Sequence, residues 1–122
     1  MLAAAIGSEI EAGADGIVVG HGTDTMGHTA AVLSFMVQDL PVPVVVVGSQ
    51  RSSDRPSSDA ARNLIHAVRT AARGEIAEVQ ICMFGPTSDQ YGLLHRGTRC
   101  RKMHSSYRST FRTVGDIPLA MV

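Results

Sequence analysis

Residue 102 is the only lysine of this 122-residue chain, which also has ten arginines. An arginine side chain stays protonated in proteins, whereas a lysine amine can lose its proton when it is buried. A site that needs a basic side chain to accept a proton can therefore use Lys102 but none of the arginines. The alternative interpretation is a solvated surface cation, because lysine side chains are mostly exposed.

A hydroxyl and a carboxylate stand side by side at Thr23 and Asp24, within residues 21–26 and directly after a short apolar run. A hydroxyl is a weak nucleophile until a base removes its proton. A neutral Lys102 amine would accept that proton and Asp24 would orient the resulting ammonium, which is the logic of a Ser-His-Asp triad with different parts. The alternative is a turn followed by a helix cap, a routine use of threonine and aspartate.

Other reactive side chains lack the spacing that their chemistry needs. Cys82 and Cys100 form neither a Cys-x-x-Cys pattern nor a disulfide framework, so we expect no metal in this chain. The glycines at 20 and 22 are not followed by a third glycine at the spacing of a dinucleotide fingerprint. Two scattered cysteines are typical of a reduced, cytoplasmic protein.

Length and charge bound the remaining possibilities. The chain is one domain or part of one. Its formal net charge is zero, but residues 1–50 contain five acidic and no basic residues, and basic residues concentrate over 96–112. That segment would suit an anion, a nucleic acid or an acidic partner, although a solubilising surface is the simpler interpretation. No apolar run approaches the ~20 residues of a membrane span, and no signal peptide is evident.

The candidate residues need a scaffold, and the hydrophobic pattern predicts helices and strands in alternation. We expect three helices, over residues 2–12, 25–37 and 58–73, and three strands, over 17–20, 44–47 and 79–84. This order predicts an α/β fold with an open parallel sheet that carries helices on both faces. Because the chain opens on a helix and the sheet is thin, we also expect a fragment, or a chain that needs a partner at its sheet edges.

Local signals refine these elements. The side-chain oxygen of Thr25 is expected to cap the second helix, and Ser58 or Asp59 the third. Gly74 is expected to end the third helix. The apolar stripe of that helix is predicted to consist of Leu64, Ile65 and Val68.

Loops that carry hydroxyl and carboxylate groups follow all three predicted strands, at residues 22–25, 48–51 and 85–89. Because ligands bind at the carboxyl ends of the strands in such sheets, these loops are expected to meet on one rim. Further along, residues 91–95 and 98–103 are expected to pair as a hairpin, and 117–122 to begin another strand.

Three ordered motifs resemble the bacterial-type L-asparaginase family. Residues 18–26, Val-Val-Gly-His-Gly-Thr-Asp-Thr-Met, look like the family's second signature. Residues 58–64, Ser-Asp-Ala-Ala-Arg-Asn-Leu, are similar to the start of a family helix, with Ala60 in place of the usual glycine. Lys102, nine residues before Phe111, matches the spacing of the family's catalytic lysine.

Two further segments, residues 48–60 and 95–106, resemble one branch of this family, the D subunits of archaeal glutamyl-tRNA(Gln) amidotransferases. The resemblance implies hydrolysis of glutamine to glutamate and ammonia. The ammonia would pass to a partner E subunit, which uses ATP and Mg²⁺ to amidate glutamate on misacylated tRNA, so this chain would meet tRNA only indirectly and hold no cofactor. A stand-alone L-asparaginase and a non-catalytic interaction module are the alternatives.

The resemblance also implies roles for single residues. Thr23 would be the hydroxyl of a Thr-Lys-Asp triad and Lys102 its base. Asp24 would orient the amine and bind the α-amino group of a glutamine or asparagine substrate. Backbone groups near Gly22 and Ser49 would line the amide site. The implied assembly has a homo-oligomeric core, with no membrane association.

Some parts of the family pattern find no match. The resemblance places residues 1–122 in the central part of the asparaginase N-terminal domain. Nothing in the sequence matches the Thr-Gly-Gly-Thr-Ile-like opening strand, the serine-bearing substrate loop or the C-terminal domain. Without those groups the nucleophile and the substrate clamps are incomplete, so we expect this chain by itself to be inactive or nearly so.

Overall fold

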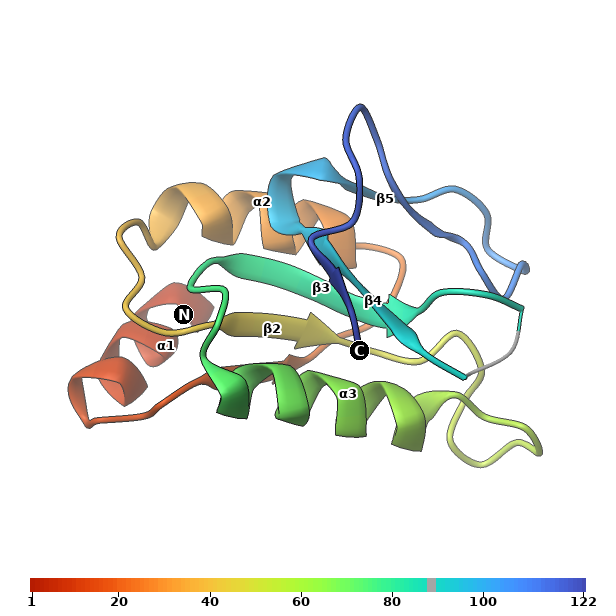
Figure 1. Ribbon diagram of the computed structural model, residues 1–122, viewed down its shortest axis with the longest axis horizontal. Coiled ribbons are helices and arrows are strands. Elements are labelled where there is room, and N and C mark those ends of the chain that lie inside the picture. Colours follow the sequence, from red (N-terminus) through yellow and green to blue (C-terminus); the bar gives the residue numbers. More distant parts are fainter. Residues whose placement is uncertain (88–89) are drawn as a thin grey trace.

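Helices cover both faces of a central sheet in this computed structural model, which describes residues 1–87 and 90–122 (Figure 1). Ser88 and Asp89, part of the predicted third rim loop, lie outside the described residues. The described α-helices are α1 (Leu2–Glu11), α2 (Met26–Met36) and α3 (Ala60–Arg73). All three lie where the sequence predicted helices.

The sheet has the strand order β1-β2-β3-β4-β7. Its parallel part consists of β1 (Ile17–Gly20), β2 (Val44–Val47) and β3 (Val79–Phe84). Its antiparallel part consists of β4 (Gly92–Arg96), which pairs with β3, and β7 (Ala120–Met121), which pairs with β4. The three predicted parallel strands and the strand expected within 117–122 are confirmed, but the whole sheet is mixed rather than parallel.

The hairpin predicted from residues 91–95 and 98–103 is wrong. The chain leaves β4 through a short 3-10 turn, η1 (Gly97–Arg99), and enters β5 (Cys100–Lys102), which pairs with β6 (Phe111–Thr113) as a separate two-stranded ribbon. Packing against α2 explains the departure. A Cβ atom at Gly97 would lie 2.7 Å from Ser34 Oγ, so only glycine allows η1 to approach α2 this closely.

Side-chain alternation along β2 separates two cores. Val44 and Val46 belong to a cluster on the face of α1 and α2, whereas Val45 and Val47 belong to a cluster on the face of α3. All four valines are buried, as period-two alternation requires of a strand covered on both faces. The prediction of helices on both faces is therefore confirmed (Figure 1).

The predicted apolar stripe of α3 is wrong. Leu64, Ile65 and Val68 are each 51% exposed. The buried face of the helix instead consists of small and polar residues, namely Asn63, His66, Ala67, Thr70 and Ala71. The strand valines already fill the space on this side of the sheet, so alanines allow a close approach and Asn63 is free to make polar contacts.

The predicted helix ends are right in position and partly wrong in mechanism. Gly74 ends α3 in the left-handed conformation at φ +68°. Thr25 and Asp59 occupy the N-cap positions of α2 and α3, but neither makes a side-chain capping bond. Ser58 Oγ instead accepts from the backbone N–H of Ala60 at 3.2 Å.

A buried polar network holds the loops that follow β2 and β3. The Asp59 carboxylate, fully buried, accepts from the backbone N–H groups of Gln50 and Arg51, both at 2.9 Å. Asn63 Nδ2 donates to the same carboxylate at 2.7 Å and to the carbonyl of Gly48 at 2.9 Å. Asn63 Oδ1 accepts from the backbone N–H of Phe84 at 3.1 Å. The start of α3 therefore fixes the ends of two neighbouring strands.

We predict that Asn63→Leu lowers the free energy of unfolding by about 3 kcal/mol, because it leaves a buried N–H, a half-buried carbonyl and part of a buried carboxylate unpaired. Urea denaturation followed by circular dichroism measures this loss. Leu64→Ala, one residue along and half exposed, is the matched control and should cost less than about 1 kcal/mol. Equal losses in the two variants would contradict the assignment.

A second prediction concerns His95 on β4, which is 1% exposed and whose Nδ1 lies 2.8 Å from Thr113 Oγ1 on β6. Burial and the nearby charge of Arg112 lower its pKa to about 4. Since the unfolded chain binds this proton near pH 6.5, the unfolded state binds more protons as pH falls from 6.5 to 4. Stability should therefore drop over that window by up to about 3 kcal/mol.

Denaturation across this pH range checks the sign, with His95→Asn as the comparison. An asparagine at this position keeps a polar group toward Thr113 but does not titrate. The plot of unfolding free energy against pH should therefore be flatter below pH 6.5 for the His95→Asn variant than for the native chain. Parallel curves for the two proteins would contradict the prediction.

Candidate functional site

Lys102 meets both residues that the sequence singled out. Its Nζ donates to Thr23 Oγ1 at 2.8 Å and to Asp24 Oδ1 at 2.7 Å, across 79 and 78 positions of the chain. The Lys102 side chain is 12% exposed, so the interpretation as a solvated surface cation is wrong. The structure thus brings Thr23, Asp24 and Lys102 together, while their catalytic roles stay predictions.

Different elements of the fold carry Lys102 and its two partners. Thr23 and Asp24 lie in the turn after β1, at the carboxyl end of the parallel sheet. Lys102 is the last residue of β5, where alternation turns it inward and leaves Arg101 exposed. Its cross-strand partner Phe111 is buried in the core beside α2. The amine is therefore aimed by a ribbon that is anchored in the core.

Gly48 sets the distance between the first two rim loops, a role that sequence analysis missed. A Cβ atom at this position would lie 2.5 Å from the carbonyl oxygen of His21 and 3.2 Å from Thr23 Cγ2. A side chain here would push the loop after β2 away from Thr23. The sequence signal was available, since a glycine directly after a buried strand marks a close backbone approach.

The predicted substrate-binding residues lie on the same rim. Gly22 is exposed, next to Thr23. Ser49 is half-buried and lines a hollow of about 260 Å³. That hollow is lined by Gly20, His21, Val47, Gly48, Ser49, Ser53, Ala60 and Leu64. A small ligand placed there would lie over the carboxyl ends of β1 and β2, as the fold class predicts.

A second cavity, of about 170 Å³, reaches the triad from the side of α2. Asp24 and Lys102 both line it, together with Gly27, His28, Ala31, Gly97, Thr98, Cys100 and Arg101. The contact between Asp24 and Lys102 is therefore open to small molecules from this side.

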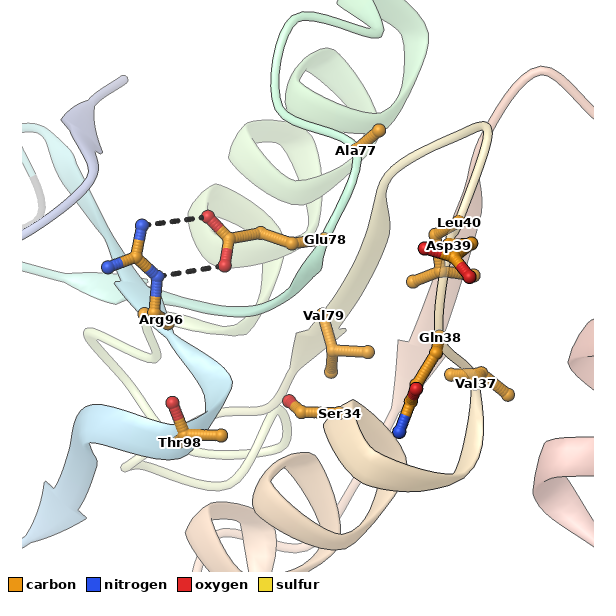
Figure 2. Close-up of a pocket in the computed structure, with 10 residues that line it drawn as sticks. All are labelled: Ser34, Val37, Gln38, Asp39, Leu40, Ala77, Glu78, Val79, Arg96 and Thr98. Atoms are coloured by element: carbon orange, nitrogen blue, oxygen red, sulfur yellow. Dashed lines mark hydrogen bonds and ion pairs between the residues drawn. The ribbon is translucent and has the colours of Figure 1, made fainter.

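A larger cavity, of about 400 Å³, lies away from this chemistry, between the end of α2 and the start of β3 (Figure 2). Figure 2 shows Arg96 and Glu78 side by side, joined by bonds of 2.9 and 3.2 Å. Asp116 adds a contact to Arg96 at 3.3 Å. The hydrogen bond and charge of Glu78 raise the pKa of Arg96, so the arginine stays charged. We interpret this cavity as the site of a structural ion pair.

Other chemistry has little support in the part of the chain that the structure describes. No three histidine, cysteine or acidic side chains gather there as a metal site would require. Burial raises the pKa of Cys82 and of Cys100 to about 12, so neither thiol is a ready nucleophile. None of the described helices is both long and apolar enough to cross a membrane.

Comparison with known proteins relates this geometry to a family. The family described as "Asparaginase, N-terminal" matches residues 1–122. The chain is 64% identical over 108 residues to the D subunit of the glutamyl-tRNA(Gln) amidotransferase of Thermococcus kodakarensis, covering 88% of this chain and 24% of that protein. It is also 58% identical over 121 residues to the D subunit of the glutamyl-tRNA(Gln) amidotransferase of Methanosarcina mazei, a match that covers 99% of this chain and 28% of that protein. The chain thus spans about a quarter of the length of these relatives.

Solved structures give the same family. The thermostable L-asparaginase from Thermococcus kodakarensis superimposes with a TM-score of 0.89 at 33% identity, over 99% of this chain and 34% of that one. L-asparaginase I from Vibrio cholerae superimposes with a TM-score of 0.82 at 36% identity, over 99% and 36%. By sequence and by fold, the chain belongs to the asparaginase family and corresponds to its N-terminal domain.

Proposed function

We propose that this chain carries the Thr23–Asp24–Lys102 part of a glutaminase, which releases ammonia from glutamine for the tRNA-dependent conversion of Glu-tRNA(Gln) to Gln-tRNA(Gln). One observation carries the proposal: a single amine bonds both the hydroxyl and the carboxylate at the rim of the sheet. The names of the amidotransferase relatives support the choice of glutamine and of a tRNA-linked reaction.

The geometry suits proton transfer. In its neutral form, Lys102 accepts the proton of the Thr23 hydroxyl across 2.8 Å. Thr23 Oγ1 then attacks the amide carbon, or takes the proton of the group that attacks it. Asp24 holds the resulting ammonium and binds the substrate's α-amino group. When the carbon–nitrogen bond breaks, the Lys102 ammonium returns the proton to the leaving nitrogen, which departs as ammonia. If a hydroxyl attacked, water then hydrolyses the ester left on its oxygen, which releases glutamate and restores the hydroxyl; if water attacked, glutamate forms directly.

The proposal includes groups beyond residues 1–122. These residues would form the central part of the family's N-terminal domain. The family's first threonine on its opening strand, the substrate-carboxylate loop and the C-terminal domain would complete the site. An E subunit with ATP and Mg²⁺ would consume the ammonia in the cytoplasm. A stand-alone L-asparaginase is the second candidate, because the solved structures that superimpose over 99% of this chain are L-asparaginases.

A chimera tests the proposal. This chain replaces the matching 108-residue segment of the Thermococcus kodakarensis D subunit, to which it is 64% identical. Released ammonia is then measured with glutamine and with asparagine. We expect the chimera to favour glutamine and the isolated chain to release little ammonia from either. A preference for asparagine would favour the stand-alone enzyme, and a folded chimera that hydrolyses neither would favour a non-catalytic module.

Within that chimera, Lys102→Met and Lys102→Arg should each lower kcat by about 10²-fold or more, because neither side chain can accept the Thr23 proton. The arginine variant is the sharper one, since it keeps the positive charge beside Asp24. Thermal unfolding of each variant controls for folding. Undiminished turnover by Lys102→Arg would reject the role of Lys102 as base.

Thr23→Val should lower kcat to a similar extent while Thr23→Ser retains most of it, because serine keeps the hydroxyl that Lys102 contacts. Steady-state kinetics on the same chimera compares the two. Equal activity of the valine and serine variants would return Thr23 to a structural role in the turn.

A further inference from the structure

The segment that follows Lys102, residues 103–110, lies outside the main sheet and needs anchors of its own. Its two ends meet, since the backbone N–H of Met103 donates to the carbonyl of Thr110 at 2.9 Å and that of His104 donates to Thr110 Oγ1 at 2.7 Å. The ribbon at its base is only three residue pairs long. The ribbon orients the backbone at Lys102, but the lysine side chain has a flexible four-carbon stem, so the exact position of the amine also depends on the segment that follows.

Two side-chain contacts tie this segment to the loop after β2. Gln50 Nε2 donates to the carbonyl of Ser105 at 2.7 Å, three residues beyond Lys102. From the other side, Arg108 Nη2 donates to the carbonyl of Ser57 at 3.1 Å. The Arg108 guanidinium also lies over the Phe84 ring, 5.4 Å from its centroid. Each segment therefore donates one side-chain hydrogen bond to a backbone carbonyl of the other.

The loop after β2 is a firm support for these contacts. The backbone N–H of Gln50 bonds the buried carboxylate of Asp59, which Asn63 also holds. Gln50 directly follows Ser49, which lines the hollow over the carboxyl ends of β1 and β2. A continuous series of bonds thus runs from Asp59 through Gln50 to Ser105, and from there along the chain to Lys102.

We propose that Gln50 and Arg108 are positioning residues for Lys102: they link the loop after β2 to the segment that holds the amine in place beside Thr23 and Asp24. The link ties the position of the base to the position of the loop that faces the ligand. Only the catalytic consequence of this inference rests on the proposed function; the fixed position of the amine does not.

The single lysine gives a readout that needs no activity. Reductive methylation of the 122-residue chain modifies only Lys102 and the N-terminal amine, and mass spectrometry measures the two rates separately. In the native protein the Lys102 side chain is 12% exposed, so its rate relative to the N-terminal amine should be low. We expect Gln50→Met and Arg108→Met each to raise this relative rate at least threefold, and the double variant at least tenfold.

Arg55→Met is the matched control, because Arg55 lies in the same loop and its side chain is 69% exposed and pairs with the exposed Asp54. Its labelling rate should equal that of the native chain. Thermal unfolding of every variant shows that labelling was measured on folded protein. If Gln50→Met fails to fold, Gln50→Glu replaces it, because glutamate keeps the size but presents a carboxylate oxygen to the carbonyl of Ser105.

Kinetics separates a positioning role from a merely structural one. In the chimera, Gln50→Met and Arg108→Met should lower kcat about tenfold with little change in KM. Native labelling rates in folded Gln50→Met and Arg108→Met chains would overturn the inference. If the chimera is inactive without these substitutions, the proposed function fails, yet the labelling experiment still decides the positioning roles.

Discussion

The contact of Lys102 with Thr23 and Asp24 depends on the chain leaving the main sheet after β4. Had residues 98–103 continued as a hairpin beside β4, the amine would have lain along the sheet and not over its rim. Gly97 removes that possibility by packing η1 against α2, where a Cβ atom would overlap Ser34 Oγ. Burial of Cys100 and Phe111 against α2 then sets the direction of the ribbon. The apolar core of one face thus decides where the basic group lies.

The loop after β2 is held in place because the polar groups that anchor it are buried and paired. Asp59 and Asn63 are both fully buried, an unfavourable place for polar groups unless every hydrogen bond is made. Here the Asp59 carboxylate accepts three N–H groups. The Asn63 amide pairs with the carbonyl of Gly48 after β2 and with the backbone N–H of Phe84 at the end of β3. Such a network loses its stability sharply when one member is removed, which keeps the loops in a single arrangement.

Much of the fold followed from hydrophobic patterning, and the failures have identifiable causes. β2 could be predicted because four consecutive valines between prolines and a glycine leave little choice. The face of α3 could not, because its large apolar residues are exposed and its buried residues are alanines and the polar Asn63, His66 and Thr70. The convergence of Lys102 with Thr23 was predicted from the types of residue and from family resemblance. Periodicity alone gave no information on a contact spanning 79 positions. The contact of Gln50 with Ser105 could not be predicted, because a glutamine in a polar loop has no distinguishing sequence pattern.

The ion pair of Asp24 and Lys102 joins one exposed and one buried side chain. The Asp24 side chain is 86% exposed, whereas that of Lys102 is 12% exposed. A carboxylate has room for about four hydrogen bonds, and the amine occupies one of them at Oδ1. The remaining lone pairs face water. Asp24 therefore has room to accept a second ammonium group while its contact with Lys102 stays in place.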